Sequence, residues 1–329
     1  MRLNSQYSRS ITNPKSPNTH TNAIIFHSVV GFIMQVLTLR LPSTALTRLK
    51  MHHSQEPQSH GPGAPSFSAR LEAATALTGI LSRHNIPHAF IGGFAFNLLG
   101  TSRSTLDIDV IIEDSAFSVT LGKTSTPIHQ IRQLLVDSDE RFSLVGRGLI
   151  PKLFFTAQTQ EKESNDPVRV PVETLRAGSL GLPQHINQIT AVRGIPVLPP
   201  RLLLLTKIKR CTNFLGSDRP KSVERFKSDE GDIKFLLKWL VEEKERVDIE
   251  GYCQSGGGTC TRALDDNTNS LIRKVGELVQ FWKEKGDEEK ETVAGLQRAM
   301  KEEDWRRVVG EQQQQEHTGA DQEGMLALL

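Results

Sequence analysis

One stretch of the sequence decides the fold: Phe90-Ile91-Gly92-Gly93-Phe94-Ala95-Phe96-Asn97-Leu98-Leu99-Gly100, followed by Arg103-Ser104-Thr105-Leu106-Asp107-Ile108-Asp109-Val110-Ile111-Ile112. An apolar strand enters a Gly-Gly turn, a short helix follows, and a second apolar strand carries two carboxylates. Strand side chains alternate between faces, so Asp107 and Asp109 project from one face, about 7 Å apart. Two like charges this close on an apolar strand are unfavourable unless a cation neutralises them. We therefore expect a divalent metal, and Mg²⁺ is favoured because it binds one or two carboxylates together with water and phosphates.

The Gly-Gly turn supplies the second half of the expected site. Backbone N–H groups at Gly92 and Gly93, just before a helix, are suited to bind phosphate. A Gly-Gly turn alone is common, whereas a turn, a short helix and a twin-carboxylate strand in this order are more specific. The alternative is a turn that only allows tight packing, with Asp107 and Asp109 as solvated edge residues. The apolar residues around the two carboxylates favour the metal site.

These motifs, in this order, resemble the polymerase-beta-like nucleotidyltransferase superfamily. Its pattern is an apolar-Gly-Gly/Ser turn followed about a dozen residues later by Asp-apolar-Asp/Glu, and here 13 residues separate Gly93 from Asp107. The Arg-x-Thr-x-Asp-apolar-Asp form that ends at Asp109 is similar to the small toxin-like and antibiotic-modifying branches. The resemblance covers about residues 70–245.

The resemblance implies an activity, the Mg²⁺-dependent transfer of a nucleoside monophosphate from a nucleoside triphosphate such as ATP to an acceptor hydroxyl. In that family the glycine turn, here Gly92 and Gly93, positions the triphosphate. The paired acids, here Asp107 and Asp109, bind the metal and are catalytic. The acceptor stays open among RNA, a protein and a small molecule. The alternative is a catalytically weak or inactive member that serves as a nucleotide-binding or protein-interaction module.

The family takes a third catalytic, metal-binding acid from a later strand, and Glu173 is the candidate here. Residues 168–175 alternate with period two, so Glu173 shares a face with Arg169 and Pro171. The family usually has Asp at this position, so Glu departs from its pattern. The alternative is an ordinary exposed strand residue. Pro171 lacks a backbone donor and predicts an edge strand or a bulge.

Two cations are candidates for contacts with the nucleotide. Arg103 faces the glycine turn and either anchors the triphosphate or pairs with a neighbouring carboxylate. Lys207 lies on an apolar helix and either reaches a phosphate, as a lysine near this position does in some relatives, or extends to water. The stretch 227–233 resembles the Lys-x-x-Asp-apolar element of those branches. Within it, Asp232 fits equally well as the N-cap of a helix.

The patterns predict an α+β fold, a mixed β-sheet nucleotidyltransferase core with helices that is followed by a helical C-terminal region. The expected organisation is a leader and linker at 1–67, a nucleotidyltransferase-like catalytic domain at 68–198, a helical region at 199–310 and a disordered tail at 311–329. Strands are expected near 88–91, 107–112, 142–145, 153–157 and 168–175. Helices are expected near 69–84, 127–135, 202–211, 232–246, 271–285 and 291–309, with a Gly-, Thr- and Asp-rich loop at 254–269.

Composition sets wide limits on function. The chain has 329 residues, a net charge of +2 and a pI near 8.4, so charge alone predicts no nucleic-acid binding surface. The sequence also lacks a basic stripe interleaved with aromatic residues. Cys211, Cys253 and Cys260 are few and odd in number, which predicts free thiols in a reducing compartment rather than disulfides or a zinc site.

The first 55 residues contain no Asp or Glu and resemble a mitochondrial transit peptide. The alternative is that translation begins at Met51. The apolar run at 23–39 is interrupted by polar residues, so no stable membrane insertion is expected. The expected location is the cytoplasm, or the mitochondrion if the leader is translated.

Overall fold

The protein is an α+β fold built on a mixed β-sheet, as the sequence predicts. The structure is a computed structural model that describes residues 64–113, 128–146, 151–158, 167–254 and 261–310. These residues lie in one compact unit, Gln55–Leu329. The expectations for most of the leader and linker, for Cys260 and for the tail at 311–329 lie outside the described residues.

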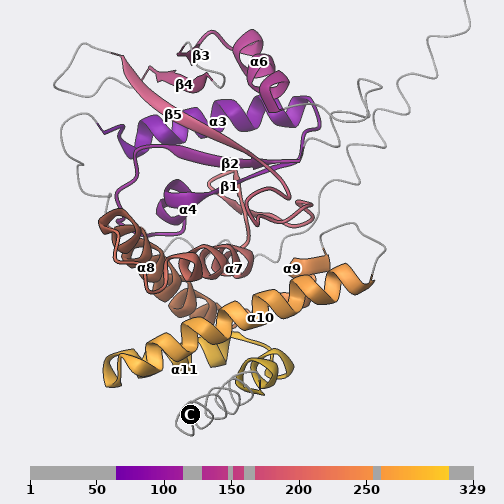
Figure 1. Cartoon of the computed structure of the whole chain (residues 1–329). Helices are drawn as coiled ribbons and strands as arrows, with labels where there is room; N and C mark the ends of the chain where they lie inside the picture. The colour runs from indigo at the N-terminus through magenta and orange to yellow at the C-terminus, as the bar shows by residue number, and fades with distance from the viewer. Residues whose placement is uncertain (1–63, 114–127, 147–150, 159–166, 255–260, 311–329) are drawn as a thin grey trace, which may run out of the picture. The chain divides into compact units, whose positions relative to one another are not determined.

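Seven strands of the described residues form one sheet in the order β3-β4-β5-β2-β1-β7-β6. Strand β2 pairs antiparallel with β1 and parallel with β5, while β4 pairs antiparallel with both β3 and β5. Strands β3, β4, β5, β2 and β1 follow one another down Figure 1. Their bounds are β1 His88–Ile91, β2 Ile108–Ile112, β3 Phe142–Val145, β4 Lys152–Ala157, β5 Val168–Arg176, β6 Thr190–Val192 and β7 Ile195–Val197.

Three helices pack directly against this sheet. Helices α3 and α6 contact the outer strands β3, β4 and β5, and α4 contacts β1 and β2. The Oγ of Ser66 accepts a hydrogen bond from the backbone N–H of Ala69 at 3.2 Å, which caps the start of α3 and satisfies one of its free amides. The bounds are α3 Phe67–Arg83, α4 Gly92–Leu98 and α6 Ile128–Ser138.

Helices α7 to α11 follow the sheet in the chain and lie below it in Figure 1. Helices α7 and α8 each begin with proline, whose fixed φ suits the first turn and whose missing N–H is not needed there. The two helices pack along each other. The bounds are α7 Pro200–Cys211, η1 Thr212–Phe214, α8 Pro220–Glu243, α9 Ile249–Gln254, α10 Thr261–Glu284, η2 Asp287–Glu289 and α11 Lys290–Ala299.

The core is continuous from the sheet into these helices. Phe90 of β1 and Phe94 of α4 are fully buried and meet edge to face, with ring centroids 5.8 Å apart. Trp282 of α10 is fully buried at the other end of the same cluster of apolar side chains. Burial of this large aromatic surface accounts for the close packing of α10.

The structure corrects several expectations about the helices. The helix expected from Asp232 begins at Pro220, and α10 begins at Thr261 inside the expected loop at 254–269. The helix expected over 291–309 is interrupted, because α11 ends at Ala299 and a separate helix covers 302–310. The short strands β6 and β7 were not expected, since three-residue runs are too short to show a period.

Pro171 does not mark an edge strand, because β5 lies between β4 and β2. Pro171 pairs with Phe154 of β4, whereas the pairing of β5 with β2 begins only at Val172. At Pro171 itself, therefore, β5 has a partner on one side only. This position tolerates a residue without a backbone donor.

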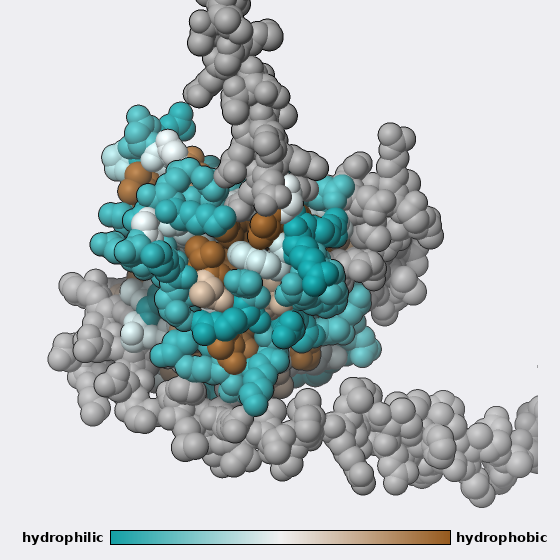
Figure 2. All heavy atoms as spheres, turned by 90° about the horizontal axis from the view of Figure 1, so that it is seen from below, coloured by the Kyte–Doolittle hydropathy of each residue, from teal (hydrophilic) through white to brown (hydrophobic). Residues whose placement is uncertain are grey.

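The helices and the visible surface were compared with what a membrane-spanning segment requires. In the described part of the chain, we find no helix with the length and apolarity needed to cross a membrane. Figure 2 shows one face of the molecule, on which hydrophilic side chains predominate and hydrophobic ones gather in a small central patch.

Cys211 and Cys253 are free thiols, as expected, and burial raises the pKa of Cys211 to about 12.

Candidate metal and nucleotide site

Three carboxylates meet where β2 and β5 run side by side. The parallel register places Asp109 directly beside Glu173, and Asp107 immediately precedes β2. One oxygen from each of these three side chains lies within 4.8 Å of the other two. The strand pairing thus brings together residues that are more than sixty positions apart in the sequence. We call Asp107, Asp109 and Glu173 the acid cluster.

The acid cluster is poor in neutralising cations. No ion pair of the described residues involves Asp107, Asp109 or Glu173. Burial, followed by the negative charges of Asp107 and Glu173, raises the pKa of Asp109 to about 7. The part of this rise that comes from the like charges is what a bound divalent cation would relieve.

Both glycines of the Gly-Gly turn are required by close packing. Gly92 has φ +65°, and a Cβ on it would lie 1.7 Å from Oδ2 of Asp109. A Cβ on Gly93 would lie 2.5 Å from Cβ and from Oγ1 of Thr105. The glycine turn therefore packs against Asp109, and in this respect the alternative of a turn needed for tight packing is correct. That alternative also expected Asp107 and Asp109 to be solvated edge residues, whereas the two carboxylates lie together with Glu173. Helix α4 has only seven residues, so its dipole adds little.

Arg70 and Thr105 support Asp107, and sequence analysis missed both. The Oγ1 of Thr105 donates a hydrogen bond to Oδ1 of Asp107 at 3.2 Å. Arg70 of α3 is fully buried and donates from its terminal nitrogen to the carbonyl of Thr105. Two other guanidinium nitrogens of Arg70 are buried without a hydrogen-bond partner, and burial lowers its pKa to about 10, opposed by the charge of Asp107. The sequence did contain one signal for this role, because Arg70 is a charged residue between the apolar residues of the helix expected near 69–84.

A second acidic group lies close by, and it is fully neutralised. Lys207 of α7 donates to Asp229 at 3.0 Å and approaches Asp232 at 2.6 Å, both on α8. Arg103 pairs with Asp232, and the Nε of Arg210 donates to Asp229 at 2.7 Å. We call these five residues the ion-pair cluster. It joins the segment before β2 to both helices.

These contacts locate the two predicted nucleotide-binding cations. Lys207 does not extend to water, because its side chain is only 5% exposed and its ammonium lies 5.1 Å from the centre of the Phe96 ring. Arg103 makes the carboxylate contact that was its alternative, and its side chain remains 29% exposed. Contact of either residue with a triphosphate stays a prediction. Lys207 is also near enough to oppose the rise in the pKa of Asp109.

Asp232 is not an N-cap, which corrects that alternative. Twelve residues of α8 precede it, so it lies in the middle of the helix, where it is buried. Burial alone would raise the pKa of its neighbour Asp229, but hydrogen bonds from Arg210 and the charge of Lys207 outweigh burial and lower that pKa. Asp229 is therefore held as a charged partner of α7, and Asp232 forms ion pairs with Lys207 and Arg103.

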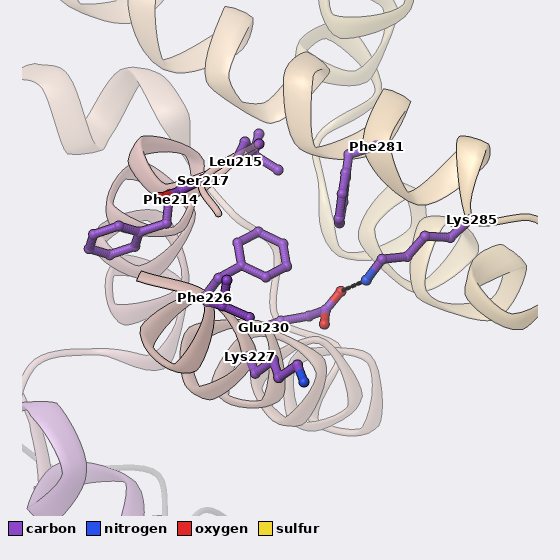
Figure 3. A pocket seen from close by; sticks show the side chains of 10 residues that line it. Phe214, Leu215, Ser217, Phe226, Lys227, Glu230, Phe281 and Lys285 are labelled. Carbon is purple, nitrogen blue, oxygen red and sulfur yellow. Dashed lines mark hydrogen bonds and ion pairs between the residues drawn. The ribbon is translucent and has the colours of Figure 1, made fainter. Parts of the chain in front are cut away.

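A hollow of about 330 Å³ lies between η1, α8 and α10. Figure 3 shows Phe226 and Phe281 on its walls, with the ion pair of Glu230 and Lys285 beside them. The ammonium of Lys285 lies 3.0 Å from Glu230 and 4.5 Å from the centre of the Phe281 ring. Trp282 also donates to Glu230, at 2.9 Å. These contacts bind α10 to α8.

Comparison with known proteins does not place this chain in a family. The chain matches no protein-family model and no curated protein. The acid cluster and its surroundings therefore carry the functional proposal below.

Proposed function

We propose that this protein is a Mg²⁺-dependent nucleotidyltransferase that transfers a nucleoside monophosphate from a nucleoside triphosphate to an acceptor hydroxyl. The observation that carries the proposal is the acid cluster, in which Asp107, Asp109 and Glu173 converge within 4.8 Å without a neutralising cation. The resemblance of its motifs to polymerase-beta-like nucleotidyltransferases supplies the reaction. The proposal includes the nucleotide contacts predicted for Gly92, Gly93, Arg103 and Lys207.

The donor set suits magnesium. All three groups of the acid cluster are carboxylates, which hard divalent cations prefer over sulfur or imidazole ligands. Asp107, Asp109 and Glu173 would hold the metal, which when bound supplies electrostatic stabilisation of the phosphates and of the attacking oxygen. Gly92 lies so close to Asp109 that a Cβ on it would meet the carboxylate, so only glycine fits beside this group.

The protein's own groups would divide the remaining work. The acceptor oxygen forms a bond to the α-phosphorus, and the bond from that phosphorus to the bridging oxygen of the β-phosphate breaks. Pyrophosphate leaves with the electron pair of that bond, and a carboxylate of the acid cluster takes up the hydroxyl proton. Asp109 and Glu173 are the candidates for this role, because they stand side by side on β2 and β5 within the acid cluster.

A transfer assay tests the proposal directly. The protein is incubated with Mg²⁺ and each α-labelled nucleoside triphosphate, and pyrophosphate release and label transfer are measured. We expect release by the wild type and its loss in Asp109→Asn, which removes one charge at nearly constant volume. Asp287→Asn is the matched control, because its side chain is 87% exposed. Equal release by wild type and Asp109→Asn contradicts the proposal.

One observation favours the second candidate, a nucleotide-binding module without turnover. Arg103 and Lys207, the cations expected to contact the triphosphate, are already paired with carboxylates of α8. Such pairing lowers the positive charge available for a leaving pyrophosphate. Magnesium-dependent binding of a labelled triphosphate without any release in the same assay would establish this alternative.

A further inference from the structure

The outer strands of the sheet have one buried face and one open face. On β4, every second side chain from Leu153 is buried, whereas those between them, starting at Lys152, are exposed or partly exposed. On β5 the same alternation leaves Val172 buried and Glu173 exposed. Because neighbouring strands in register share their faces, the exposed side chains of β4 and β5 form one surface. Glu173 of the acid cluster belongs to it.

Of the helices in the described residues, α6 can be placed on the buried face of these strands from a side-chain contact. The helices that contact β3, β4 and β5 are chiefly α3 and α6. From α6, the Nε of Arg132 donates to Oγ1 of Thr174 at 2.6 Å, and Thr174 shares its face with Val172. Helix α6 therefore lies on the face opposite to Glu173. We call the face of β4 and β5 that carries Lys152, Phe154, Arg169 and Glu173 the platform, and through Glu173 it continues into the acid cluster.

The strand register sets the order of side chains on this platform. Leu153 is paired with Val172, so the next residues along the two strands, Lys152 and Glu173, are neighbours on the open face. Phe154 is paired with Pro171. The last pair of β4 and β5 on the open face is Thr156 with Arg169. A cation, an aromatic ring and a second cation thus follow one another away from the acid cluster.

The spacing and charge of the platform suit an extended polyanion. Arg169 is four residues from Glu173 on the same strand, which places the far cation about 13 Å from the cluster. Glu173 is the only acidic side chain in β3, β4 and β5. Neither Lys152 nor Arg169 takes part in an ion pair of the described residues. Both charges are therefore available to a ligand.

We propose that this open face binds a single-stranded nucleic acid and that the strand's terminal hydroxyl is the acceptor of the transferred nucleotide. The proposal rests on the proposed nucleotidyltransferase function. Aromatic side chains that stack bases, combined with cations that follow the backbone, are the means by which sheet surfaces bind single strands. Phe154 stacks a base, while Lys152 and Arg169 contact the phosphates on either side of it.

The other acceptor classes fit this surface less well. An extended polypeptide is bound by adding to the free edge of a sheet, and β4 and β5 are both interior strands. A small molecule needs a concave pocket that encloses most of its surface, which an open sheet face does not provide. The charges of the platform are instead spaced along the direction of the strands.

Binding of a labelled strand tests the proposal without any turnover. A short 5′-fluorescein oligouridylate, and separately an oligothymidylate, is titrated with the full chain, and fluorescence anisotropy is read without metal or nucleotide. We expect Lys152→Gln and Arg169→Gln each to weaken binding about threefold to tenfold and to reduce the salt slope by about 0.7. Phe154→Leu is expected to weaken binding about fivefold or more with little change in the salt slope.

Matched variants separate the platform from general charge and apolarity. Arg306→Gln and Leu180→Ala are the controls, because the Arg306 side chain is 76% exposed and Leu180 is 85% exposed elsewhere on the surface. The proposal is overturned if neither oligonucleotide binds, or if the platform variants bind as tightly as the controls. A preference for oligouridylate over oligothymidylate identifies RNA, and the reverse identifies DNA.

The outcome is distinguishable from failure of the proposed function. If strand binding depends on Lys152, Phe154 and Arg169 but no pyrophosphate is released, the proposed binding surface is supported and the proposed nucleotidyltransferase activity is contradicted. If no oligonucleotide stimulates pyrophosphate release and the labelled phosphate is recovered on a protein or small molecule, the nucleotidyltransferase activity is supported. The proposal that a nucleic-acid strand is the acceptor is then overturned.

Discussion

Two groups of carboxylates are linked to the segment around residues 103–107 that leads into β2, and they differ in how far their charges are neutralised. In the ion-pair cluster, Asp229 and Asp232 are matched by Lys207, Arg103 and Arg210. In the acid cluster, the described side chains supply no ion pair at all. The paired charges of the ion-pair cluster join α7 and α8 to the segment before β2. The carboxylates of the acid cluster repel one another, and a bound cation would lower that repulsion.

The first prediction breaks the acid cluster and has the largest expected effect. Asp107→Asn is expected to lower transfer by roughly a hundredfold or more, since a metal ligand contributes most when charge develops on the phosphates. The melting temperature without metal should not fall, because the substitution removes repulsion. Pyrophosphate release and thermal unfolding are measured together. A loss of transfer that only accompanies unfolding would point to a structural role instead.

The second prediction breaks the ion-pair cluster. Asp229→Asn leaves the buried Lys207 and the adjoining Arg210 without their shared partner, and it should lower the free energy of unfolding by about 3–5 kcal/mol. Chemical denaturation measures the change. Asp287→Asn, with its exposed side chain, is the control and should leave the unfolding midpoint unchanged. A midpoint that stays the same in Asp229→Asn would show that the pairs contribute no net stability.

The third prediction contrasts the pH dependence of the two clusters. The folded-state pKa of Asp109 is raised to about 7, so its contribution to stability is complete at acid pH and is lost as the pH rises from about 4 through 7. The pKa of Asp229 is lowered, so its contribution is present above its ordinary value and is lost as the pH falls through the folded value. Thermal unfolding of Asp109→Asn from pH 4 to 8 should lack the loss at higher pH.

The effect of Mg²⁺ on the melting temperature should depend on pH. Added Mg²⁺ should raise the melting temperature of the wild type by several degrees above pH 7 and have little effect near pH 5, where Asp109 keeps its proton. The same addition should leave the melting temperature of Asp109→Asn almost unchanged. A magnesium effect that is equal at both pH values would contradict binding at the acid cluster.

The fourth prediction concerns the support of the acid cluster and has the smallest expected effect. Arg70→Met keeps the buried volume but removes the hydrogen bond to the carbonyl of Thr105 and a positive charge near Asp107. We expect Mn²⁺ binding, followed by electron paramagnetic resonance, to weaken several-fold. Arg70→Lys should recover part of the affinity because its ammonium group can still donate to the carbonyl of Thr105. Unchanged affinity in Arg70→Met would remove Arg70 from the site.

The sequence was sufficient for the local elements that have a clear period or a turn signal. The Gly-Gly turn, the strands on either side of it and the alternating strand that holds Glu173 all lie where the pattern predicts them. The start of α8 was wrong by twelve residues, because the charged stretch from Pro220 has no apolar stripe of its own. Likewise, the Gly-rich composition near Thr261 masked the first turns of α10.

Sequence by itself determined the pairing of two aspartates on one strand and a glycine turn before it, because strand alternation and glycine chemistry act over a few residues. Only the tertiary structure decided that Glu173 stands beside Asp109, that Lys207 is a buried ion-pair partner, and that Lys152, Phe154 and Arg169 share an open face. The physical reason is strand register and helix packing, which bring distant residues together through burial of the core and leave no periodic trace in the sequence.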